Sequence, residues 1–150
     1  MEREIKFRLI KHATFLESEL QDFPGFRSLL WEDYHKDRSK RRDVERWIEN
    51  IINSSIDISK IILVVEKIPA PDTYKELVAS ISLIPGFHKE RMNVLSEWVR
   101  FRNIIAHEYL DVRWASIKRF IEEGEPLYKS FLEDVKEYLE KQLEPGSAKK

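Results

Sequence analysis

The sequence contains no cysteine. That absence excludes a disulfide framework, a thiolate metal site and a cysteine nucleophile, and it fits a reducing compartment. Only 4 glycines and 6 prolines occur, which leaves little room for the tight turns of an all-β fold. No apolar window approaches the length of a membrane span, and the charged N-terminus lacks the apolar core of a signal peptide. We therefore expect a cytoplasmic protein that does not associate with a membrane.

The length and composition are those of one globular domain. A chain of 150 residues can bury a single core without disulfides or a metal ion. Hydrophobic residues make up 42% and charged residues 35%, as in a chain rich in exposed helix. We expect one helical domain over residues 1–143. The remaining residues, 144–150, are predicted to form a disordered tail.

Helical periodicity runs along most of the chain. The strongest signal lies between Arg41 and Glu66, where spacings of four and three relate Val44, Ile48, Ile51, Ser55, Ile58, Ile62 and Val65. Proline and glycine divide the rest into expected main helices over 2–21, 72–84, 89–109 and 126–142, with shorter helices over 26–35 and 114–122. Short links imply antiparallel neighbours. The sequence therefore predicts an all-α, up-and-down antiparallel bundle of about five to six helices.

Arg102 occupies an unusual place on the helix expected over 89–109. At 100° per residue it falls between Leu95 and Ala106, inside an apolar arc that also contains Val94, Trp98, Phe101 and Ile105. Burial of an unpaired guanidinium is very costly. Arg102 therefore needs a carboxylate, an anionic ligand or a water-filled cleft beside it. An ordinary ion pair would meet this need as well as a binding site would.

His107 follows Arg102 by five residues, which places it about 140° further round a continuous helix. The two side chains then face different directions, unless the helix ends or distorts near Ala106 or the pair meets across a subunit boundary. His107 shares a helical edge with Asn103 and Arg100, and Asn103 is placed to orient the imidazole by a hydrogen bond. The plainer interpretation is a surface histidine or a cation at a helix end.

These residue types suit cleavage of RNA through its own 2′-OH. Histidine supplies a base that exchanges protons near neutral pH, and arginine supplies a fixed cation for the charge on phosphorus. No metal or cofactor is required. Basic residues also cluster, as a nucleic-acid site requires, and the candidates for weak RNA binding are Arg38, Lys40, Arg41, Arg42 and Arg113. A solvated helix surface explains such clusters equally well.

The segment from Arg102 to Tyr109 resembles the Arg-x4-His-x-Tyr motif of HepT-like toxins, within the HEPN superfamily. The stretch Arg41–Ile62 resembles the long central helix of that family. The resemblance implies a helical bundle that forms a homodimer and acts as a metal-independent endoribonuclease. Arg102 and His107 would be the catalytic pair in a cleft at the dimer interface. The supporting residues would be Asn103, Glu108 and Arg100.

The resemblance also implies a partner and a means of control. The family is paired with a small nucleotidyltransferase antitoxin of MntA type, which can attach AMP to the motif tyrosine, here Tyr109. The added phosphates beside His107 would block an RNA backbone by charge and bulk. The chain would then be the toxin of a type II toxin–antitoxin system.

Two other functions fit the same residues. The first is a non-catalytic HEPN module that binds a nucleotidyltransferase or its nucleotide. The second is a structural helical adaptor, which requires Arg102 to be saturated by an internal carboxylate.

Overall fold

A computed structural model describes residues 1–143, and the tail expected over 144–150 lies outside these residues. All regular structure in the described range is helical, which confirms the all-α fold. The elements are α1 (Arg3–Leu20), α2 (Phe23–Phe26), α3 (Trp31–Lys36), α4 (Arg38–Val65), α5 (Tyr74–Ser80), the 3-10 helix η1 (Ile81–Leu83), α6 (Lys89–Trp98), α7 (Phe101–His107) and α8 (Leu110–Leu143). None of these described helices is long and apolar enough to cross a bilayer.

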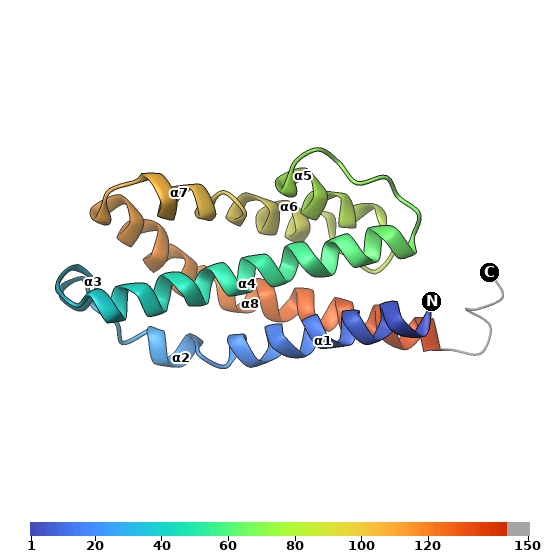
Figure 1. Cartoon of the computed structure of the whole chain (residues 1–150), viewed down its shortest axis with the longest axis horizontal. Coiled ribbons are helices and arrows are strands. Elements are labelled where there is room, and N and C mark those ends of the chain that lie inside the picture. Colours follow the sequence, from blue (N-terminus) through green and yellow to red (C-terminus); the bar gives the residue numbers. More distant parts are fainter. Residues whose placement is uncertain (144–150) are drawn as a thin grey trace.

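The long helices α1, α4 and α8 run side by side, and α5, α6 and α7 form a further layer along them (Figure 1). The chain direction reverses from α1 to α4, again from α4 to the α6–α7 pair, and once more at α8. The predicted up-and-down antiparallel bundle is therefore confirmed. The start of α4 and the connection from α7 to α8 lie at the same end of the bundle.

The central helix α4 buries the predicted stripe. Every member of that stripe is buried except Val65, which is half-buried. The helix begins at Arg38 rather than Arg41 because Asp37 caps it. Its Oδ1 accepts hydrogen bonds from the backbone N–H groups of Ser39 at 3.0 Å and Lys40 at 3.1 Å, which would otherwise lack helical partners.

Phe120 on α8 is the centre of the aromatic core. Its side chain has no exposed surface. The centroid of its ring lies 5.1–6.2 Å from those of rings on α2, α4, α6, α7 and α8, namely Phe23, Trp47, Trp98, Phe101 and Tyr128. Each aromatic ring buries a large apolar surface, so this cluster joins both layers of the bundle.

The break expected between the helices over 114–122 and 126–142 is wrong, because α8 continues through Gly124 and Pro126 to Leu143. Pro126 has no N–H and removes one helical hydrogen bond. Buried side chains on either side of it keep both halves of the helix packed on the core, namely Phe120, Ile121, Tyr128 and Phe131. Packing therefore outweighs the local preference of proline.

Gly124 has a packing role rather than a helix-ending one. A Cβ atom at this position would lie 3.3 Å from Cζ of Phe23, closer than most real contacts. The missing side chain lets α2 approach α8.

The single helix expected over 26–35 does not form, because α2 ends at Phe26 and α3 begins at Trp31. Pro24 lies in the first turn of α2, where proline is tolerated.

The single helix expected over 89–109 is also wrong, because a turn at Val99 and Arg100 divides it into α6 and α7. The N–H of Val99 bonds to the carbonyl of Ser96 at 3.3 Å, and that of Arg100 to Glu97 at 3.2 Å. These bonds reach back three residues rather than four, which tightens the backbone. The turn changes the direction in which the side chains of α7 point.

We expect Phe120→Ala to destabilise the protein by about 3–5 kcal/mol, because it leaves a cavity among the aromatic rings of the core. The free energy of unfolding, measured by urea denaturation, tests this expectation. Lys118→Ala, an exposed change on the same helix, should stay within about 0.5 kcal/mol of wild type. Equal effects of the two substitutions would contradict the central role of Phe120.

Candidate functional site

The motif residues lie on α7 and the turn that follows it. Phe101, only 1% exposed, packs against Phe120 and holds this short helix on the core. Arg102 and His107 are exposed on its outer side. The helix ends where Glu108 becomes extended, with φ −96° and ψ 159°.

The placement of Arg102 inside an apolar arc is wrong. Its side chain is exposed, and so is that of Ala106. The reason is the turn at Val99 and Arg100, which interrupts the arc that a continuous helix would have formed. Within residues 1–143 no carboxylate forms an ion pair with Arg102. Its guanidinium Cζ instead lies 5.4 Å from the centroid of the Tyr74 ring.

A single chain keeps Arg102 and His107 apart. The helix is continuous from Phe101 to His107, so the angle of about 140° between them persists. The distortion precedes Arg102, and the helix ends only after His107, so neither brings the pair together. His107 lines a surface pocket to which Arg102 does not contribute.

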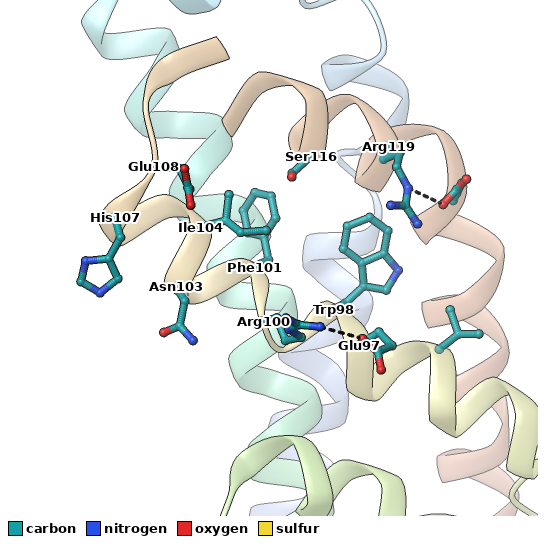
Figure 2. A pocket seen from close by; sticks show the side chains of 12 residues that line it. Glu97, Trp98, Arg100, Phe101, Asn103, Ile104, His107, Glu108, Ser116 and Arg119 are labelled. Atoms are coloured by element: carbon teal, nitrogen blue, oxygen red, sulfur yellow. Dashed lines mark hydrogen bonds and ion pairs between the residues drawn. The ribbon is translucent and has the colours of Figure 1, made fainter. Parts of the chain in front are cut away.

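That pocket lies between α6, α7 and the first half of α8 and has a volume of about 650 Å³. Its apolar wall includes Trp98, Phe101 and Ile104. Figure 2 shows Asn103 and His107 projecting in a similar direction from α7. In the described part of the chain, His107 makes no hydrogen bond with either Asn103 or Glu108. Their supporting roles therefore remain predictions.

Four other charged residues at this pocket are paired within the chain, namely Arg100, Glu97, Arg119 and Glu123. Arg100 Nη1 lies 3.6 Å from Glu97 Oε2, and Lys75 Nζ lies 2.9 Å from Glu97 Oε1. The hydrogen bond from Lys75, followed by the charges of Lys75 and Arg100, lowers the pKa of Glu97. On the opposite wall, Arg119 pairs with Glu123 at 3.4 Å. The predicted supporting residue Arg100 is thus paired with a carboxylate, whereas Arg102 is not.

Arg113 anchors the turn that carries Tyr109. Its Nε donates to the carbonyl oxygen of Glu108 at 2.9 Å, and its Nη1 donates to Glu45 Oε2 at 3.4 Å. The buried Tyr34 hydroxyl donates to the same carboxylate oxygen of Glu45. Burial and the nearby Glu45 raise the pKa of Tyr34 well above its usual value. The structure therefore gives Arg113 internal partners, while Tyr109 is 84% exposed.

The remaining basic candidates divide into two groups at the start of α4. Arg38 and Arg42 are exposed and line a second pocket. Arg41 Nη1 donates hydrogen bonds to the backbone carbonyl oxygens of Tyr34 and His35, both at 3.1 Å. Lys40 pairs with Asp33 at 3.4 Å. Within residues 1–143, no group of three or more histidine, aspartate or glutamate side chains is placed to hold a metal ion.

Sequence reasoning missed the residues that hold the motif in place. Glu45 and Tyr34 support the turn through Arg113, and Tyr74 contacts Arg102. Each of these partners lies far from the motif in the sequence. No spacing in the sequence indicates that these residues contact the motif.

Comparisons with known proteins agree with the fold. A HEPN toxin from Shewanella oneidensis, tri-AMPylated and in complex with MNT antitoxin, superposes with a TM-score of 0.70 at 16% identity, covering 91% of this chain and 99% of that one. A toxin–antitoxin structure with AMP-PNP superposes with a TM-score of 0.71 at 15% identity, covering 90% and 99%. A comparison with curated protein sequences found no match.

The family model described as "Ribonuclease HepT-like" matches residues 16–135, which include most of the bundle and the whole motif. The match spans the central helix, the turn between α6 and α7, and the segment from Arg102 to Tyr109. The chain therefore belongs to the HepT-like family of the HEPN superfamily.

Proposed function

We propose that this protein is the toxin of a toxin–antitoxin pair and acts as a metal-independent endoribonuclease. The observation that carries the proposal is the exposure of Arg102, His107 and Tyr109 on one short, anchored helix and its following turn. Arg102 has no carboxylate partner in residues 1–143, so its N–H donors remain available for a phosphate. The adaptor function required such a carboxylate and is therefore disfavoured.

The proposed reaction uses the RNA's own 2′-oxygen. That oxygen attacks the adjacent phosphorus, and the bond from phosphorus to the 5′-oxygen breaks. The products are a 2′,3′-cyclic phosphate and a free 5′-hydroxyl. His107 accepts the 2′-OH proton or returns a proton to the 5′-oxygen, and Arg102 stabilises the charge on the phosphoryl oxygens. No cofactor enters the reaction.

A second copy of the chain would complete this site. Arg102 and His107 face different directions on α7, so one chain does not direct both at the same phosphate. In an isologous dimer the same surface of each copy faces the other. If α7 lies near the two-fold axis, Arg102 of one copy approaches His107 of the other. We therefore propose a homodimer with composite sites.

Control by AMPylation is the second part of the proposal. The two solved structures described above are toxin–antitoxin complexes, one AMPylated and one with AMP-PNP. Tyr109 is 84% exposed, more than any other large hydrophobic side chain in residues 1–143. Its phenolic oxygen would attack the α-phosphorus of ATP, with pyrophosphate as the leaving group and a nucleotidyltransferase antitoxin as the catalyst. The phosphate charge beside His107 would then exclude RNA.

The purified protein should cut RNA in the presence of EDTA, and His107→Ala should lower kcat by about 10²–10⁴-fold, because the variant lacks the proton-transferring group. Circular dichroism checks that the fold is retained. His35→Ala removes an exposed histidine of α3 and should cut like wild type. Equal cutting by wild type and His107→Ala would indicate a contaminating nuclease. An inactive wild type that binds the nucleotidyltransferase tightly would instead favour the non-catalytic module.

The composite site predicts complementation between two inactive variants. Arg102→Ala and His107→Ala should each be inactive alone. Unfolded together and refolded as a mixture, they should regain part of the wild-type rate, because a mixed dimer contains one intact pair. Cleavage assays on the mixture, with light scattering to determine mass, test this expectation. A strict monomer in scattering would rule out the composite site.

Co-expression with the proposed nucleotidyltransferase antitoxin should increase the intact mass by one or more AMP units. The increase should disappear in Tyr109→Phe, which lacks the accepting oxygen, and RNA cutting by that variant should no longer be suppressed by the antitoxin. Intact mass spectrometry and cleavage assays measure the two effects. Unchanged AMP addition to Tyr109→Phe would place the modification elsewhere.

A further inference from the structure

Three side chains from three separate elements meet beside the motif. Tyr74 is the first residue of α5 and is 45% exposed. The ammonium Nζ of Lys60, on α4, lies 4.7 Å from the centroid of the Tyr74 ring. The guanidinium Cζ of Arg102, on α7, lies 5.4 Å from the same centroid. One exposed aromatic ring therefore contacts two cations.

The position of the ring is set by the local fold. Thr73 caps α5, and its Oγ1 accepts a hydrogen bond from the N–H of Glu76 at 3.1 Å. Leu77 and Val78, one turn further on, are buried against the core. The helix is thus fixed at its start and along its inner face. Tyr74 is held at the surface without depending on its own burial.

A ring and a carboxylate hold a cation differently. An aromatic face attracts a cation through its quadrupole. It does not accept hydrogen bonds from the in-plane N–H groups of a guanidinium, which stay free for another ligand. A carboxylate attracts the charge but occupies those donors and neutralises it. Neither Lys60 nor Arg102 pairs with a carboxylate in residues 1–143. Nearby, Lys75 and Arg100 are both paired with Glu97.

We propose that Lys60 and Arg102, held by Tyr74, form a two-cation site for RNA phosphate. Arg102 contacts the phosphate that is cut, and Lys60 contacts the adjoining phosphate of the same strand. Tyr74 is a positioning residue, because it acts through Arg102. This inference rests on the proposed ribonuclease function and adds two residues to its substrate site.

RNA is the ligand favoured by this arrangement. Two positive groups without a neutralising partner attract a polyanion, and the ammonium of Lys60 is a compact point charge suited to a phosphate oxygen. The arrangement includes Arg102, which binds the phosphate that is cut in the proposed reaction. An acidic surface on the antitoxin would use the same charges, and the experiment below separates the two.

Lys60→Gln and Lys75→Gln provide a matched pair of variants, since each removes one positive charge from this region. Both are made in the non-cutting His107→Ala protein. Binding of a single-stranded RNA oligonucleotide is measured against salt concentration. We expect Lys60→Gln to reduce the slope of log affinity against log salt by about 0.7, the loss of one phosphate contact. Lys75→Gln should leave the slope unchanged, because the ammonium of Lys75 is paired with Glu97 at 2.9 Å rather than with RNA phosphate.

Tyr74 is tested in the protein that still cuts. Tyr74→Leu should lower kcat about tenfold or more by releasing Arg102, whereas Tyr74→Phe should restore most of the wild-type kcat because it keeps the ring. Both variants should melt at nearly the wild-type temperature. A merely structural role for Tyr74 would lower the melting temperature and leave kcat of the folded fraction unchanged.

The outcomes separate this inference from the proposed function. If the wild type cuts RNA but Lys60→Gln and Lys75→Gln have equal slopes, the two-cation site is wrong and the ribonuclease proposal stands. If Lys60→Gln weakens only binding of the nucleotidyltransferase, the site belongs to the antitoxin and the inference is overturned. If the wild type neither binds nor cuts RNA, both proposals fail.

Discussion

The burial of Phe120 among rings from α2, α4, α6, α7 and α8 is the interaction on which the site depends. The motif lies on α7, a helix of only 7 residues, which is too short to be stable in isolation. Phe101 anchors this helix by packing against Phe120. The motif residues can therefore remain exposed, because apolar contacts on the opposite side of α7 hold the backbone. Stability comes from the core, and the polar groups are left available for chemistry.

The contacts that position the motif do not form hydrogen bonds with the side-chain N–H groups of Arg102 or His107. Arg113 bonds to the backbone carbonyl of Glu108 and not to a motif side chain. Tyr74 contacts Arg102 through its ring. Arg100 and Lys75, by contrast, both form ion pairs with the single carboxylate of Glu97. Arg102, His107 and Lys60 have no charged partner within residues 1–143, which leaves them available to an anionic strand.

Sequence patterns predicted the bundle well where one periodicity dominated. The stripe on α4 was correct because a repeat of four and three residues identifies the face that must be buried. The helix break expected before Pro126 was wrong, because the tendency of proline to end a helix is weaker than the packing of buried rings on both sides of it. The turn at Val99 and Arg100 was missed because neither residue disfavours a helix strongly enough to mark a boundary. That error placed Arg102 inside an apolar arc, although it is exposed.

The helical period, the short links and the motif were sufficient to establish an all-α antiparallel bundle, its family and the identity of the candidate residues. These features are local, so they can be read along the chain. The direction in which Arg102 points and its contacts with Tyr74 and Lys60 could not be obtained in this way. They depend on how α4, α5 and α7 pack on a common core, and a helix's own period does not specify which neighbour its exposed side chains will meet.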